Sequence, residues 1–159
     1  MLQLVPESWL TWNYDLLDGD RLIAGIRVSS LPESGTFSID GSSYSARRAG
    51  IFSGEYTLEL NGQIIARAQK PSAFVNSFEI QYSDKRYALK KESFIGRSFV
   101  LLDGDRQIGS IQAKGFLSRK ADVELPEEIP LPIKVFILWL GILLWRREAN
   151  ASSETTQVV

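Results

Sequence analysis

The chain has 159 residues, of which 44% are hydrophobic, 23% are charged and 11% are aromatic, and its formal net charge is −1. This composition is typical of one globular domain, and the absence of a basic excess argues against a duplex nucleic-acid binder. The sequence contains neither cysteine nor histidine. Disulfides, thiolate or imidazole metal ligands and the most common general bases are therefore excluded.

The first eight residues are predicted to be an N-terminal extension, 1–8. They include Pro6 and Glu7 but no basic segment of the kind that opens a secretory signal. A cytoplasmic protein is therefore expected.

A series of short strands follows. Apolar Trp12, Tyr14 and Leu16 alternate with polar Asn13 and Asp15, which is the period-two pattern of a strand with one buried face. Runs of this kind recur up to Glu124 and predict about eleven strands, or twelve if the N-terminal piece splits. The predicted strands are Trp12–Leu16, Leu22–Val28, Thr36–Ile39, Ser42–Arg48, Gly54–Leu60, Gln63–Lys70, Ser77–Tyr82, Arg86–Lys90, Arg97–Leu102, Arg106–Gln112 and Arg119–Glu124.

One hairpin sequence is repeated. Leu16–Arg21 returns as Leu101–Arg106, and a shorter version is Leu60–Gln63. Each contains Asp-Gly or Asn-Gly, as does the Asp40-Gly41 turn, and these pairs supply the positive φ angles of tight hairpins. The paired aspartates could also be read as metal ligands. A calcium loop needs a longer series of oxygen ligands, however, so turn chemistry is the preferred interpretation and no metal site is predicted.

So many antiparallel strands in a short chain predict a barrel, because closure removes exposed sheet edges. A barrel of about 12 strands is too wide for its own side chains to fill. The strands that follow the repeated turns carry small residues, which leave room for an insert: Ala24, Ala66, Ala68, Gly109 and Ser110.

The only long apolar run, Val135–Trp145, is the predicted insert. Pro132 suits the first turn of a helix, and Arg146 and Arg147 would complement the dipole at a helix end near 147. The segment from Lys134 would extend about 18 Å, whereas a bilayer core needs about 30 Å. A buried central helix over about 133–147 is therefore preferred to the alternative, a membrane anchor formed by 133–145. The core residues predicted on this helix are Phe136, Leu138, Trp139, Leu140, Leu143 and Trp145.

With these elements in place, the chain resembles the Tubby C-terminal-like superfamily, which includes the LURP-one-related proteins and the phospholipid scramblases. The resemblance covers Trp9 to Arg147 and implies a closed, mainly β antiparallel barrel around a hydrophobic C-terminal helix. Its domain would occupy 9–147, followed by a small, polar, disordered tail, 148–159. The segments that carry it are Tyr44–Arg48, Leu60–Ala66, Phe78–Ile80, Arg97–Phe99, Ile108–Ile111 and Phe136–Trp145.

The resemblance also implies a membrane-associated or regulatory role. This chain lacks a cysteine-rich palmitoylation segment and a calcium-loop pattern, so scramblase-type anchoring and calcium dependence do not transfer. Basic residues on several strands could form a surface for anionic headgroups, and the candidate contacts are Arg47, Arg86, Lys90 and Arg119. A solvated exterior balanced by acidic residues is the alternative reading of the same residues.

No arrangement of residues indicates catalysis. Nothing resembles a Walker loop, a dinucleotide fingerprint or a supported serine–lysine pair, so neither an enzyme nor a cofactor is expected. We expect a binding module for an anionic phospholipid or membrane surface, or for a protein partner, but not for nucleic acid. The protein would be cytoplasmic and peripheral to the membrane. The alternative is a scramblase-like, single-pass membrane protein anchored by 133–145.

Overall fold

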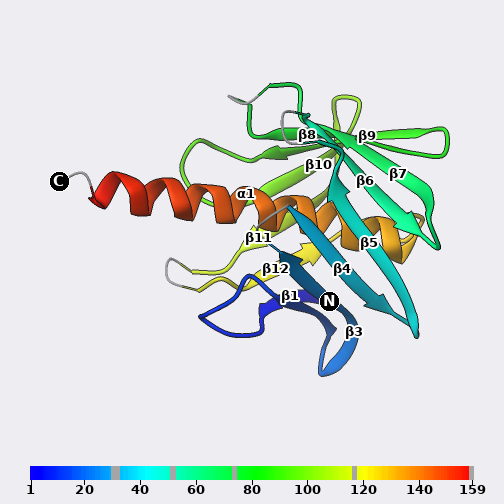
Figure 1. Ribbon diagram of the computed structural model, residues 1–159, viewed down its shortest axis with the longest axis horizontal. Helices are drawn as coiled ribbons and strands as arrows, with labels where there is room; N and C mark the ends of the chain where they lie inside the picture. Colours follow the sequence, from blue (N-terminus) through cyan, green and yellow to red (C-terminus); the bar gives the residue numbers. More distant parts are fainter. Residues whose placement is uncertain (30–32, 51–52, 73–74, 116–117, 158–159) are drawn as a thin grey trace.

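The computed structural model describes residues 1–29, 33–50, 53–72, 75–115 and 118–157. In these residues, short strands are followed by one C-terminal helix (Figure 1). The elements are β1 Leu2–Pro6, β2 Tyr14–Asp18, β3 Arg21–Ser29, β4 Ser34–Ile39, β5 Ser42–Arg48, β6 Glu55–Leu60, β7 Gln63–Gln69, β8 Ser77–Tyr82, β9 Lys85–Lys91, β10 Phe99–Asp103, β11 Arg106–Ala113, β12 Ala121–Glu124 and α1 Leu131–Gln157.

The strands form one closed antiparallel barrel in which each strand pairs with its neighbours in sequence. β1 closes the ring by pairing with both β2 and β12. The predicted fold class, a mainly β closed barrel with a C-terminal helix, is confirmed. The boundary at the N-terminus is corrected, because most of the predicted extension 1–8 is strand β1. Its inward residue Leu4 is fully buried, which ties this strand to the core.

The repeated hairpin sequence gives a repeated structure. The hairpins β2–β3, β6–β7 and β10–β11 are spaced four strands apart around the barrel, and each has a register shift after a buried leucine. These leucines are Leu16, Leu58 and Leu101, and each lies opposite a small residue, either Ala24, Ala66 or Gly109. Ala24 and Ala66 are buried in the core that holds the helix. Gly109 makes room for another segment instead, because an added Cβ there would lie 2.6 Å from the Glu124 carbonyl oxygen, so the predicted role of this glycine is wrong.

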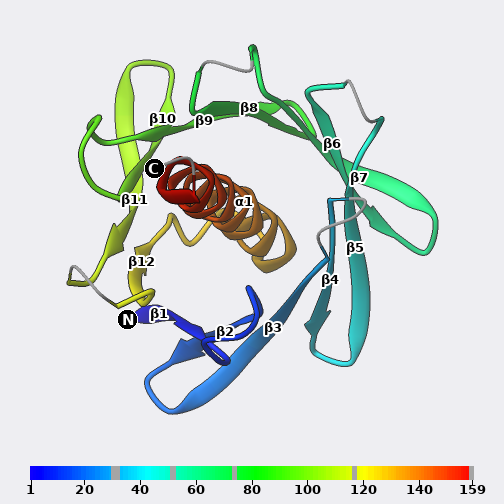
Figure 2. The ribbon, with the colours of Figure 1, turned by 60° about the vertical axis from the view of Figure 1, so that its left-hand side comes forward.

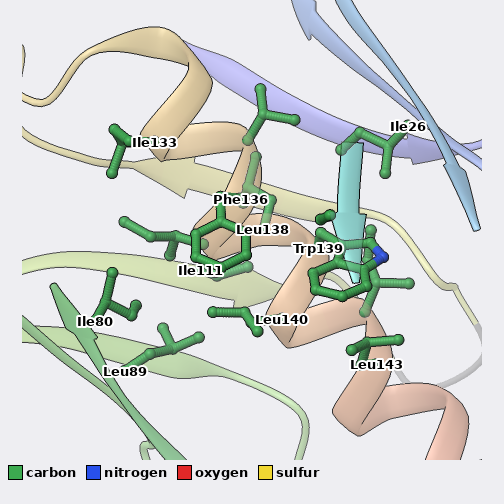
Figure 3. Packing of buried hydrophobic residues seen from close by; sticks show 14 of the residues in the cluster. Ile26, Ile80, Leu89, Ile111, Ile133, Phe136, Leu138, Trp139, Leu140 and Leu143 are labelled. Atoms are coloured by element: carbon green, nitrogen blue, oxygen red, sulfur yellow. The ribbon is translucent and has the colours of Figure 1, made fainter. Parts of the chain in front are cut away.

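The helix passes through the centre of the barrel (Figure 2). Its side chains project toward strand residues such as Ile26, Ile80 and Ile111 (Figure 3), and Trp139 is fully buried. Space for this indole comes from Gly35, where an added Cβ would lie 2.5 Å from Trp139 Nε1. The structure buries each of the helix residues proposed for the core, Phe136, Leu138, Trp139, Leu140, Leu143 and Trp145.

The aromatic residues of the repeated hairpins hold the two tryptophans of the helix. The ring centroids of Tyr14 and Phe99 lie 6.1 and 5.8 Å from that of Trp145. The third equivalent residue, Tyr56, lies 5.9 Å from Trp139. Such tilted and edge-on contacts are favourable arrangements for aromatic pairs.

The helix is longer than predicted. It begins at Leu131 and ends at Gln157, so residues 148–157, which were assigned to a disordered tail, continue the helix. Extending a formed helix needs no new nucleus, and this segment contains no glycine or proline to stop it. Glu148 also ties the first turn of the extension to the barrel through an ion pair with Lys91, at 2.5 Å.

The burial of the helix can be compared with the alternative expectation that 133–145 form a membrane anchor. Residues Ile133 to Trp145 are enclosed by the strands, apart from partial exposure of Lys134. Within the described ranges, no helix combines the length and the apolar character needed to cross a bilayer.

The two ends of the barrel differ. At the turn end, where the helix begins, two-residue turns join the strands, and positive φ angles occur at Gly19, Asp40, Asn61, Ser83 and Gly104. At the opposite end, here called the loop end, longer connections surround the emerging helix (Figure 2). In the Asp18–Arg21 and Asp103–Arg106 turns the aspartates pair with the arginines at 3.5 and 3.8 Å, which matches the turn interpretation.

Candidate functional site

Three neighbouring connections at the loop end are held together by two arginines. Arg97, between β9 and β10, donates to the carbonyls of Gly115 and Ser118, between β11 and β12. Arg119 in turn donates to the carbonyls of Thr11 and Ser8, between β1 and β2. Because β1, β12, β11, β10 and β9 are consecutive around the barrel, these bonds fix a continuous arc of loops.

Large apolar side chains are exposed on this arc and on the adjoining connection between β7 and β8. Phe94 and Leu10 are almost completely accessible, and the others are strongly or partly exposed. This set, called the apolar loop residues below, comprises Trp9, Leu10, Val75, Phe94 and Ile95. Exposed apolar residues that gather on one part of a surface are typical of an interaction site.

Two hollows lie among these residues. One, of about 560 Å³, is lined by Trp9, Arg119 and Lys120. The other, of about 500 Å³, is lined by Val75, Phe94 and Lys90 together with neighbouring polar residues. Each hollow combines apolar side chains, two cations and one carboxylate, that of Glu7 in the first and that of Glu92 in the second.

Several cations at the loop end lack a carboxylate partner among the residues described here. Arg97 and Arg119 bond only to carbonyls, and Arg119 also lies over the Trp12 ring, 4.7 Å from its centroid. The set is Lys70, Lys90, Arg97, Arg119 and Lys120. The tight turns at the opposite end carry six aspartates, which Arg21, Lys85 and Arg106 offset only in part: Asp18, Asp20, Asp40, Asp84, Asp103 and Asp105. The excess of acidic residues there contrasts with the cations of the loop end.

A second group of charges surrounds the helix where it leaves the barrel. Arg147 grips Glu33 with two bonds, from Nη2 to Oε1 at 2.6 Å and from Nε to Oε2 at 3.1 Å. Arg48 and Arg146 also lie within 3.4 and 3.6 Å of the same carboxylate. Arg147 donates to the Tyr56 hydroxyl as well. We call these residues, together with Lys70, the mouth cluster.

The charges of the mouth cluster perturb one another. Burial alone would raise the pKa of Glu33, but the hydrogen bond from Arg147 and the charges of the three arginines outweigh it, and the net pKa is lowered. The pKa of Lys70 is also lowered, first by burial and then by the positive charges of Arg147 and Arg48. Lys70 therefore belongs electrostatically to the cluster, and its ammonium donates to the Ser72 carbonyl at 2.6 Å.

The structure does not bring the four predicted lipid contacts together. Lys90 and Arg119 lie at the loop end, beside the apolar loop residues. Arg47 is on the wall of the barrel, where it pairs with Glu59 at 3.0 Å. Arg86 is the second residue of β9, near the turn end, and lies opposite Gln81. Arg47 and β9 are separated by three strands, so the four cannot form one patch.

Sequence analysis missed the apolar loop residues and the mouth cluster. Phe94-Ile95 is an apolar pair between two predicted strands and Trp9-Leu10 is one just before the first predicted strand, and their position outside the strands is the signal that could have identified them. Glu33 carried no such signal, because its partners are distant in sequence. Within the described part of the chain, no group of acidic residues is arranged to hold a metal ion.

Comparisons with profiles of known families, with curated proteins and with solved structures found no match to this chain.

Proposed function

We propose that this protein is a non-enzymatic, tubby-like binding module that docks onto anionic membrane surfaces through its loop end. The observation that carries the proposal is the coincidence, at one end of the barrel, of the apolar loop residues with cations that have no carboxylate partner. The closed barrel around a C-terminal helix is also the architecture that the sequence resemblance implies.

The physical argument has two parts. Each lysine or arginine near an anionic leaflet contributes about 1 kcal/mol, and burying the loop side chains among the lipids adds a hydrophobic contribution of roughly 25 cal/mol per Å². The acidic tips of the turn end would point away from such a surface. The extended helix also leaves through the loop end. We therefore expect the barrel to dock in a tilted orientation, in which the loops joined by Arg97 and Arg119 face the lipids.

The alternative, a scramblase-like protein anchored by 133–145, is the weaker proposal. In the barrel those residues are enclosed by strands and contact the aromatic residues of the repeated hairpins. Anchoring would require the barrel to release its own core, at the cost of the apolar contacts that the helix makes there.

Vesicle flotation tests the proposal. We expect binding to phosphatidylcholine vesicles that contain phosphatidylserine, weaker binding to phosphatidylcholine alone, and a decrease as salt is raised. The double variant Phe94→Ser/Ile95→Ser should lose most of the binding. The matched control is Leu22→Ser, because Leu22 is 60% exposed but lies beside a turn at the opposite end.

Charge is tested in the same way. Lys90→Gln/Lys120→Gln should weaken binding to the anionic vesicles by at least about tenfold, whereas Lys85→Gln, at the turn end, should have no effect. Equal loss in the loop-end variants and their controls would refute docking by the loop end. A wild-type protein that stays unbound with both vesicles would refute the membrane proposal and leave the loop end as a surface for a protein partner.

A further inference from the structure

We propose that the mouth cluster is a binding site for a phosphate-type oxyanion. The inference does not depend on membrane docking, because it stands on the residues around the emerging helix, of which only Lys70 also belongs to the loop-end cations. Three arginines, Arg48, Arg146 and Arg147, meet a single carboxylate, Glu33. A fourth cation, Lys70, lies close enough to feel the positive charges of Arg147 and Arg48 and bonds to a neutral carbonyl, that of Ser72.

This balance of charge is unusual for a partly buried position. The side chains of Arg146 and Glu33 are only 7% and 14% exposed, so water screens the cluster poorly. One carboxylate cannot neutralise four cations, and the remaining excess of positive charge is a cost to the fold unless an anion joins the cluster.

The helix dipole does not offset this excess. Cations are stabilised near the end of a helix, but α1 continues to Gln157, well beyond Arg146 and Arg147. The dipole interpretation made from the sequence is therefore wrong. Besides Glu33, the acceptors that the described residues provide for Arg146 and Arg48 are neutral carbonyls, those of Ser29 and Ser53 respectively.

The donors fit an oxyanion of the phosphate type. Guanidinium groups present planar forks that match phosphate oxygens, and Lys70 adds a point charge. The side chains of Arg48 and Arg147 remain 29% and 33% exposed, so the cluster can be reached from solvent. Glu33 acts as the organiser, because its two oxygens hold Arg147 in a fixed orientation.

Thermal unfolding with inorganic phosphate tests the site. At equal ionic strength, phosphate should raise the Tm of the wild-type protein more than chloride does. Lys70→Met keeps the aliphatic stem and removes one charge, so it should weaken phosphate binding by about tenfold without lowering the Tm of the free protein. Lys120→Met is the matched control, since Lys120 is an exposed lysine outside the cluster, and it should bind phosphate normally.

The opposite results would overturn the inference. A Tm that responds equally to phosphate and chloride would show that the cluster is only a structural clasp. The same holds if Lys70→Met lowers the Tm of the free protein but leaves the phosphate response intact. Arg48→Gln repeats the test at a second cation, in case one variant fails to fold.

The same chemistry could come from a free phosphate or from a lipid headgroup. Vesicles with phosphatidic acid, which carries a phosphomonoester, are compared with vesicles with phosphatidylserine, which carries a phosphodiester. A preference for phosphatidic acid that Lys70→Met abolishes would indicate a headgroup ligand. Phosphate binding without that preference would indicate a soluble ligand. If the wild-type protein does not bind phosphate but still floats with anionic vesicles, this inference alone is refuted and the proposed function stands.

Discussion

The two halves of the helix α1 are held by different forces. From Ile133 to Trp145 the helix is enclosed by apolar side chains of the barrel, and its position there is set by hydrophobic packing. At Arg146 and Arg147 the same helix meets the mouth cluster, where ion pairs and hydrogen bonds take over. Hydrophobic packing fixes the position of the helix in the barrel. Arg48 and Arg147 of the mouth cluster, in contrast, remain partly exposed and can bind an additional anion.

The largest expected effect comes from placing a charge in the packed half. Leu140 is fully buried, so Leu140→Asp would leave an unpaired carboxylate in the core. The cost should exceed the roughly 5–15 kcal/mol by which domains are stable, and the barrel should not fold. Near-UV circular dichroism and the unfolding transition would measure this.

The control is Leu22→Asp, which changes an exposed leucine at the turn end and should leave the barrel folded. If Leu140→Asp kept a native transition, the central position of the helix would be wrong. That result would also reopen the membrane-anchor alternative for 133–145.

How far the sequence predicted the fold depends on whether its signals are local. Alternating residues and Asn-Gly or Asp-Gly turns act within a few residues, so most strands and the buried helix were predicted. β1 was not predicted, because its role depends on pairing with β12, at the far end of the chain. The extension of α1 was missed because its small polar residues have no periodic apolar face.

The site was harder to predict, for the same physical reason. Lys90 and Arg119 were chosen as basic residues without knowledge of which ends of the strands meet. Glu33 joins residues from β5 and α1, and no sequence pattern places a lone glutamate beside three arginines. Long-range contacts of this kind become visible only once the barrel has closed.

The second prediction concerns the mouth. Glu33→Gln keeps the size of the side chain but leaves Arg147 and its neighbours without their carboxylate. We expect a loss of about 2–3 kcal/mol in the free energy of unfolding, measured by urea denaturation. Glu59→Gln is the control, because Glu59 pairs with Arg47 on the solvated wall of the barrel and should cost under about 1 kcal/mol. An equal loss of unfolding free energy in Glu33→Gln and Glu59→Gln would show that the ion pairs at the mouth contribute no more than those on the wall of the barrel.

The third prediction is a dependence on pH. Because the pKa of Glu33 is lowered in the folded protein, its stabilising effect is fully present above its ordinary pKa of 4.5 and is lost as the pH falls through the folded value. The midpoint of urea unfolding should therefore drop in acid, and the drop should be smaller in Glu33→Gln. Parallel curves for the two proteins would show that other carboxylates cause the acid sensitivity.

The smallest expected effects come from two tyrosines at equivalent positions of the repeated hairpins. Tyr14 lies in the packed region, where its hydroxyl has no hydrogen-bond partner in the described part of the chain, and burial raises its pKa to about 12. Tyr56 lies at the mouth, where its hydroxyl accepts a hydrogen bond from Arg147.

Tyr14→Phe removes an unsatisfied polar atom, so we expect the free energy of unfolding to stay constant or rise by up to about 1 kcal/mol. Tyr56→Phe removes a hydrogen bond to a charged group and should lower it by about 1–2 kcal/mol. The same chemical change should thus have opposite signs in the two regions when both are measured by urea denaturation. A similar loss in both variants would mean that the Tyr14 hydroxyl is stabilised in the folded protein, and the packed region would then be less purely apolar than the structure shows.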